Sequence, residues 1–178
     1  MFRRFALLVS LTAVSMLRGS EHLLSPLPNA STPAAMQLDT VGNIYVAGTF
    51  VSTNANFYSA FVAKLSADGS QVLYFTALAG SAGNNYANAL AVGSDGSVYV
   101  GGSTFSSDFP VTAGALQSTF TGASQGFFAK LNPAGALVYS TFLNGPATSV
   151  TGVALDGAGD VFLTGLGETG LTDRKSVV

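Results

Sequence analysis

Short hydrophobic runs alternate with polar turns that end in glycine along most of this chain. In one stretch, the small and apolar residues 87–92 are followed by the turn 93–96 and then by the β-branched and aromatic run 98–104. A second pair of runs, separated by another such turn, occupies residues 127–143. Runs of this length between Asp, Asn, Ser and Gly predict β-hairpins. Their hydrophobic residues are nearly continuous, which predicts sheets covered on both faces.

The pattern is written three times at a nearly fixed spacing. Each copy has a turn glycine, and these are Gly42, Gly96 and Gly159. Their spacings are 54 and 63 residues, and a second glycine follows each of them at the same offset. Lys64 and Lys130 correspond in the same way, and the additional residues of the second copy lie in the connection 106–124. A spacing of this size indicates a repeat architecture, whose modules bury their hydrophobic faces against one another.

Each repeat is therefore predicted to be hairpin, connection, hairpin, which forms a four-stranded antiparallel sheet. Face-to-face stacking of such sheets in a propeller covers both faces, whereas a β-sandwich predicts cleaner alternation and no such repeat. The predicted fold is an all-β propeller fragment of about two and a half blades, and the blades are residues 34–78, 87–143 and, in part, 149–165. The turns suit a type I turn closed by a left-handed glycine, where a Cβ would clash. The structural turn glycines are Gly42, Gly69, Gly96, Gly135 and Gly159.

Several linked motifs resemble the bacterial SBBP repeat, a family named for the seven-bladed β-propeller. The matching residues are 39–48, 61–65, 109–112 with Ala115, and 139–143, within a region that spans about residues 34–172. The resemblance implies a closed ring of roughly 380 to 440 residues at this spacing, so we expect a fragment whose missing blades complete the ring. The acid that usually precedes F-V-A-K-L is replaced here by Ser59 and Gln125, so a site built on it is not carried over.

The two ends of the chain depart from the repeat pattern. Residues 1–17 place Arg3 and Arg4 before a short hydrophobic run, which predicts a secretory signal peptide, with a buried helix as the alternative. Residues 18–33 are predicted to form a Pro-rich linker, and residues 173–178 are interpreted as a non-native tail. The expected location is secreted, extracellular or at the cell surface, with no membrane span after signal removal.

Composition and charge exclude several classes of function. The chain has a net charge of −2, 9% charged residues, no basic run and no cysteine. Nucleic acid as a partner and any site that needs a thiolate are therefore disfavoured. The one histidine, His22, lies in the linker, and the segment 165–170 matches a dinucleotide motif without the helix and acid that the motif requires. We expect no cofactor, metal site or catalytic residue in the repeats.

The remaining polar candidates lie in turns, in strands and in one long connection. Five aspartates are interpreted as turn-forming residues, and they are Asp39, Asp68, Asp95, Asp156 and Asp160. The recurring lysines are expected to pack their stems along a strand, and a ligand-binding ring of lysines is the alternative. The connection 106–117 is the predicted recognition loop, because long loops on a rigid scaffold carry function more often than short ones. Its candidate residues are Asp108, Phe109, Pro110 and Gln117.

Two functions are compatible with these sequence features. The first is a secreted or cell-surface repeat scaffold with a binding or structural role toward an unknown extracellular protein or glycan. The second is an extracellular propeller enzyme, a lyase or glycan hydrolase, whose active residues lie in the missing blades. The chain has no general acid–base pair outside the turns, which favours the first function over the enzyme. Phe109 also has a purely structural alternative, in which it fills the space between adjacent sheets.

Overall fold

The computed structural model describes residues 27–28, 31–51, 57–143 and 148–167. Within these residues it contains ten β-strands and no helix. The strands are β1 (Thr32–Leu38), β2 (Ile44–Val51), β3 (Tyr58–Leu65), β4 (Val72–Leu78), β5 (Asn85–Val92), β6 (Val98–Thr104), β7 (Gln125–Leu131), β8 (Leu137–Phe142), β9 (Ser149–Leu155) and β10 (Val161–Leu166). The predicted signal peptide and the predicted tail lie outside the described residues. A search of the described residues for a membrane-spanning helix found none.

The strands form three antiparallel sheets in the order of the chain. The sheets are β1-β2-β3-β4, β5-β6-β7-β8, and the pair β9-β10. The prediction of an all-β fold with four-stranded antiparallel sheets is confirmed, and among the described residues the sheets do not close into a ring. Strand β1 begins at Thr32, inside the segment interpreted as a linker. Pro33 is tolerated there because β1 is an edge strand and its register shifts beside this residue.

The repeated sequences occupy equivalent places in their sheets. Strands β2, β6 and β10 are each the second strand of a sheet. In the first sheet Tyr45 pairs with Lys64, and in the second sheet Tyr99 pairs with Lys130 at the same place. The spacing seen in the sequence therefore corresponds to a structural repeat.

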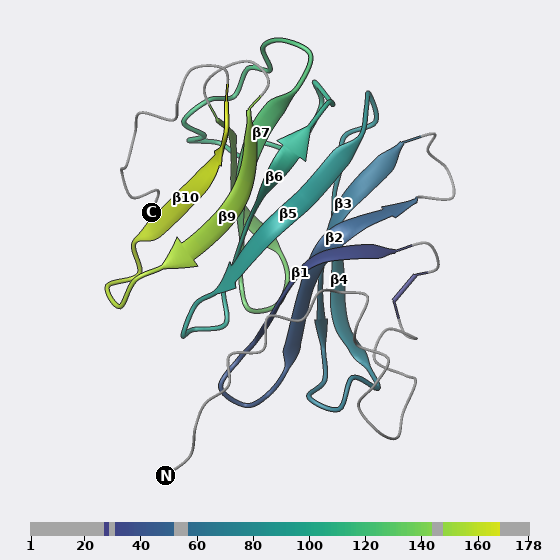
Figure 1. Cartoon of the computed structure of the whole chain (residues 1–178), viewed down its shortest axis with the longest axis vertical. Coiled ribbons are helices and arrows are strands. Elements are labelled where there is room, and N and C mark those ends of the chain that lie inside the picture. The colour runs from purple at the N-terminus through teal and green to yellow at the C-terminus, as the bar shows by residue number, and fades with distance from the viewer. Residues whose placement is uncertain (1–26, 29–30, 52–56, 144–147, 168–178) are drawn as a thin grey trace.

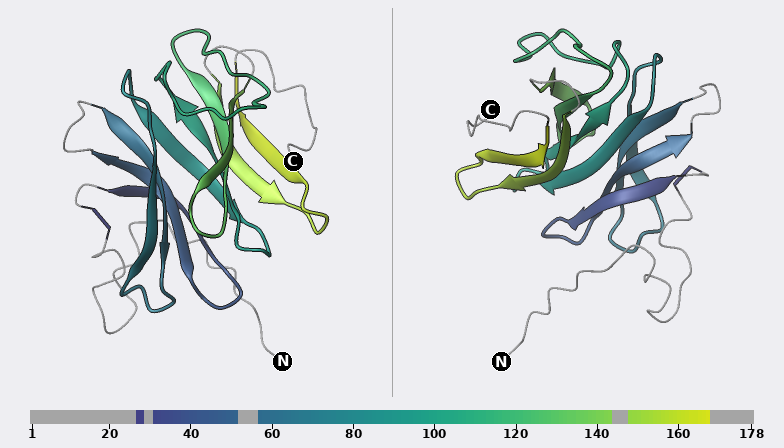
Figure 2. Two further views of the ribbon diagram at one scale, coloured as in Figure 1. Left: turned by 180° about the vertical axis from the view of Figure 1, so that it is seen from behind. Right: turned by 45° about the horizontal axis from the view of Figure 1, so that its top comes forward.

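Successive sheets pack face to face. Strand β5 lies against β1, β2 and β3, and β9 lies against β5, β6 and β7 (Figures 1 and 2). The main hydrophobic core lies between the first two sheets and includes Tyr45 and Leu78 from one and Val98 and Phe127 from the other. A Cβ added to Gly101 would lie 2.4 Å from Cγ1 of Val150, so the approach of β6 to β9 requires a glycine.

The two ends of the sheets differ in kind. Because every sheet begins with a hairpin and its strands alternate in direction, all five tight turns lie at one end, which we call the turn end (Figure 1). The longer connections between hairpins and between sheets lie at the other, which we call the connection end. Its described connections are residues 79–84 and 105–124.

Candidate binding surface

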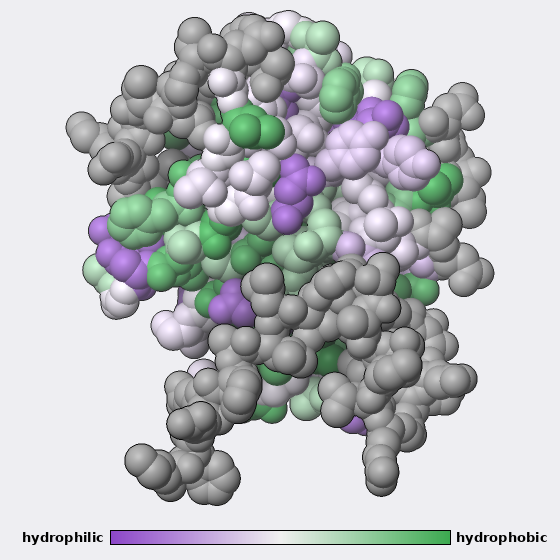
Figure 3. Space-filling model, in the orientation of Figure 1, coloured by the Kyte–Doolittle hydropathy of each residue, from purple (hydrophilic) through white to green (hydrophobic). Residues whose placement is uncertain are grey.

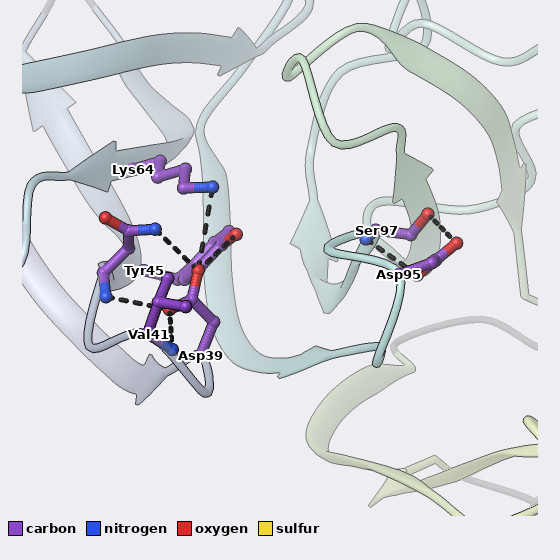
Figure 4. Close-up of polar contacts among 7 residues, drawn as sticks. Asp39, Val41, Tyr45, Lys64, Asp95 and Ser97 are labelled. Carbon is purple, nitrogen blue, oxygen red and sulfur yellow. Dashed lines mark hydrogen bonds and ion pairs between the residues drawn. The ribbon is translucent and has the colours of Figure 1, made fainter.

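In the tight turns at the turn end, polar side chains accept hydrogen bonds from backbone N–H groups of the same turn. Asp39 accepts hydrogen bonds at Oδ1 from the backbone N–H groups of Val41, at 3.0 Å, and Asn43, at 2.9 Å (Figure 4). Asn132 and Asp156 accept the equivalent pairs of bonds in their turns. The five turn glycines have φ values of 91°, 71°, 84°, 84° and 89° for Gly42, Gly69, Gly96, Gly135 and Gly159. Asp39 and Asp156 thus act here as turn-forming groups, and Asp160 contributes its backbone N–H to the bond with Asp156.

Hydrogen bonding also sets the protonation of these carboxylates. Burial acts to raise the pKa of Asp39, but the hydrogen bonds to its carboxylate, those from Asn43 foremost, outweigh burial and lower the pKa. Hydrogen bonds from Ser97 likewise lower the pKa of Asp95 (Figure 4). Those from Ser66 and Ser70 lower the pKa of Asp68 to about 2. These groups are charged acceptors at neutral pH and are poorly suited to donate a proton to a substrate.

The recurring lysines lie over tyrosine rings near the turn end. Lys64 Nζ lies 4.9 Å from the centre of the Tyr45 ring and 3.8 Å from Oδ2 of Asp39 (Figure 4). Lys130 Nζ lies 5.1 Å from the centre of the Tyr99 ring. Each ammonium therefore makes a cation–π contact within its own sheet, which agrees with the packing interpretation of these lysines. Within the described residues, no group of three or more His, Cys, Asp or Glu is placed to hold a metal ion.

The predicted recognition loop is tied to the rest of the molecule by two of its four candidate residues. The Asp108 carboxylate accepts bonds from the Ser81 N–H at 2.8 Å, the Ser81 hydroxyl at 2.7 Å and the Ala82 N–H at 3.1 Å. These bonds, that from the Ser81 side chain first, lower the pKa of Asp108. The backbone of Gln117 bonds to β8, since its carbonyl accepts from the Phe142 N–H at 3.1 Å.

The other two candidates lie closer to the core. Phe109 is 2% exposed, and the centre of its ring lies 4.5 Å from that of Phe127, as the structural alternative for this residue describes. Pro110 is half-buried beside it. The phenylalanine is therefore part of the core, and a recognition role for the loop as a whole stays a prediction.

Three aromatic side chains that the sequence motifs did not single out meet at the connection end. They are Tyr58 at the start of β3, Tyr86 in β5 and Phe105 after β6, and we call them the aromatic surface. The ring centres of Tyr58 and Tyr86 are 6.1 Å apart with the planes at 34°, and those of Tyr86 and Phe105 are 6.2 Å apart at 83°. Tyr58 and Phe105 are each 46% exposed, and Tyr86 is half-buried. In the space-filling view, side chains of intermediate hydropathy lie beside hydrophobic ones at the upper right, over this end of β3 and β5 (Figure 3).

The fully buried side-chain amide of Asn85 holds together the backbone segments that carry the aromatic surface. Asn85 is 0% exposed, and its Nδ2 donates to the carbonyls of Gly83 at 2.9 Å, Gly80 at 3.3 Å and Tyr58 at 3.4 Å. Its Oδ1 accepts from the Thr104 hydroxyl at 2.7 Å. One side chain therefore joins the first sheet, the connection between the sheets and the end of β6.

The neighbouring asparagine holds two of the ring-bearing residues directly. Oδ1 of Asn84 accepts from the backbone N–H of Tyr58 at 2.9 Å. The backbone carbonyl of Asn84 accepts from the N–H of Phe105 at 2.8 Å. Together, Asn84 and Asn85 hold the backbone of Tyr58 and of Phe105, the two residues whose rings lie next to that of Tyr86. Two adjacent asparagines at the start of a strand are the signal in the sequence that points to such bonding.

The aromatic surface carries almost no charge nearby. Asp108 is the one charged residue in the described part of the connection end, and its carboxylate is occupied by Ser81 and Ala82. The other charged side chains of the described residues lie in the tight turns or next to them at the turn end. The two ends therefore suit different chemistry, with ionic contacts within the protein at one and neutral, aromatic and amide groups at the other.

No protein-family model and no curated protein matches this chain, so its resemblance to the SBBP repeat rests on the motifs in its sequence.

Proposed function

We propose that this chain is a β-propeller repeat scaffold with a binding role outside the cell, and that it binds through its connection end. The observation that carries the binding role is the aromatic surface, in which exposed rings from two sheets sit on a buried hydrogen-bond network. Exposed aromatic clusters on a rigid support are typical of interaction sites. The turn end offers less, because its carboxylates are already bonded within their own turns.

The order of packing supports the propeller arrangement. The first strands of the three sheets follow one another in space, since β5 contacts β1 and β9 contacts β5. Within each sheet the strands then follow in the order of the chain from that first strand, which is the strand order of a propeller blade. A crystal structure in which β1, β5 and β9 do not face a common axis would refute this part of the proposal.

Binding is tested by probing the full chain against an array that holds both glycans and extracellular peptides. The test variant is the double substitution Tyr58→Ala and Tyr86→Ala. The matched control is Phe162→Ala in β10, because Phe162 is 51% exposed yet lies outside the aromatic surface. We expect the parent and the control to bind the same probes and the double variant to lose them. Equal binding by the double variant would show that the connection end is not the site.

A further inference from the structure

The aromatic surface also indicates the class of its ligand, an inference that rests on the proposed function. We propose that Tyr58, Tyr86 and Phe105 bind an uncharged oligosaccharide, with sugar rings stacked on the exposed aromatic faces. A sugar ring has apolar C–H faces and a rim of hydroxyl groups, and a tyrosine likewise combines an apolar face with a hydroxyl donor and acceptor.

The charges of the described residues favour a neutral ligand at this surface. Anionic ligands such as phosphates or uronic acids are recognised through Arg and Lys, which bind them by charge-assisted hydrogen bonds. The described part of the connection end has no Arg or Lys, and Lys64 and Lys130 lie toward the turn end. A cationic ligand could contact the ring faces, but it would find no free carboxylate among the described residues there, because that of Asp108 already accepts bonds from Ser81 and Ala82. The complementary ligand is therefore neutral.

The size of the surface favours a small ligand over a protein. A full aromatic side chain presents roughly 150–250 Å², so rings that are 46% exposed offer about 70–120 Å² each. Tyr58 and Phe105 together with the less exposed Tyr86 therefore offer less than about 360 Å², whereas a stable protein interface takes about 800 Å² from each partner. A few sugar units fit this area, and a folded protein does not.

The angles between the planes of the three rings limit the shape of the ligand that can stack on them. The planes of Tyr58 and Tyr86 are tilted by 34° and those of Tyr86 and Phe105 by 83°. Rings at such angles do not form a flat platform, so a flexible or twisted chain fits them better than the flat face of a crystalline polysaccharide. Asn84 and Asn85 hold the underlying backbone before any ligand arrives, which lowers the entropic cost of binding.

The experiment is calorimetric titration of the full chain with defined hexasaccharides. The neutral probes are the β-1,4-linked hexamers of glucose, xylose, mannose and N-acetylglucosamine and the α-1,4-linked hexamer of glucose. The charged probes are hexagalacturonate and a heparin-derived hexasaccharide. Covering roughly 60 Å² of one ring changes Kd about tenfold, so we expect at least one neutral probe to bind and Tyr86→Ala to weaken it about tenfold. Tyr86→Phe, which keeps the ring, should stay within about threefold of the parent, and Phe162→Ala should leave the Kd unchanged.

The outcomes separate the inference from the proposed function. Binding of a neutral probe that is weakened about tenfold in Tyr86→Ala and is insensitive to salt supports the inference, because no ion pair contributes. If only charged hexasaccharides or array peptides bind, and the ring variants abolish that binding, the ligand class is wrong while the binding role survives. If no hexasaccharide and no array probe depends on Tyr58 or Tyr86, both are refuted. Circular dichroism of each variant shows that a lost signal does not come from unfolding.

Discussion

Replacing Asn85 by alanine tests whether one buried amide holds the connection end together. The side chain is fully buried and makes four hydrogen bonds, of which the two shortest are to the Gly83 carbonyl at 2.9 Å and the Thr104 hydroxyl at 2.7 Å. Alanine removes all four and fills none of the space that the amide leaves. The Gly83 carbonyl keeps one partner, the Ser106 hydroxyl at 2.7 Å, whereas Thr104 loses its acceptor.

The size of the effect follows from these bonds. Each of the two short bonds contributes about 0.5–1.5 kcal/mol net, and a buried group left without a partner costs about 1–3 kcal/mol. We therefore expect Asn85→Ala to lower the free energy of unfolding by about 2–6 kcal/mol. For a chain of this size, 1 kcal/mol corresponds to about 2–4 °C in Tm, so Tm should fall by about 4–24 °C.

Urea and thermal unfolding measure this loss, and Asn88→Ala provides the matched control. Asn88 is half-buried, and its Nδ2 makes two longer bonds, to Ser149 Oγ at 3.2 Å and to the Val150 carbonyl at 3.1 Å. Its loss should cost about 1 kcal/mol. Hydrogen exchange at the Tyr58 and Phe105 amides should accelerate in Asn85→Ala and not in the control. A loss below about 1 kcal/mol for Asn85→Ala, or one equal to that of the control, would refute the reasoning.

Three further predictions concern the turn end. Gly135 has a φ of 84°, and a Cβ there would lie 2.6 Å from the Tyr74 ring, so Gly135→Ala should lower the free energy of unfolding in urea by about 2–4 kcal/mol. The control is Gly157→Ala, where an added Cβ meets nothing within 4 Å and stability should change by less than about 1 kcal/mol. Equal effects of the two substitutions would contradict the steric explanation. The pKa of Asp68 is lowered from 3.8 to about 2, so its contribution to stability is complete above about pH 4 and is lost as the pH falls through about 2; Asp68→Asn should reduce that loss in acid unfolding, and an unchanged acid profile would count against it. Burial, with a smaller effect of Tyr45, raises the pKa of Tyr74, so this phenol should stay protonated while the exposed tyrosines ionise. The absorbance titration of the native protein should therefore change little in Tyr74→Phe. If the variant lacked part of the phenolate absorbance that the parent develops early in the titration, the raised pKa would be disproved.

The strands and turns could be predicted because their causes are local. A glycine such as Gly96, three residues after the start of its turn, marks a tight reversal wherever it occurs. The hydrophobic runs on either side then give the hairpin, and the repeat gives the order of hairpins in each sheet. The predicted bounds differ from the structure by two residues at three strand starts, since β1 begins at Thr32, β5 at Asn85 and β7 at Gln125. For β1 the reason is Pro33, which is typical of a linker but is tolerated in an edge strand.

The aromatic surface could not be predicted, because its cause is not local. Tyr58 and Tyr86 lie in different sheets and come together only when β5 packs on the first sheet. The role of Asn85 likewise depends on carbonyls from two separate segments. Phe109 left two interpretations open in the sequence, and its burial was decided by the path of the connection. That path is fixed where the N–H of Thr112 donates to the Ser140 carbonyl at 3.1 Å.

The separation of the two ends bears on how such a chain diverges. The second copy is longer than the first, and its additional residues lie wholly between β6 and β7, on one rim of the molecule. Insertions there leave the opposite rim and the spacing between sheets unchanged. Under the proposed function, a unit can therefore gain residues on its binding rim without a change in its tight turns, provided that the buried groups of that rim, such as Asn85 and Phe109, are kept.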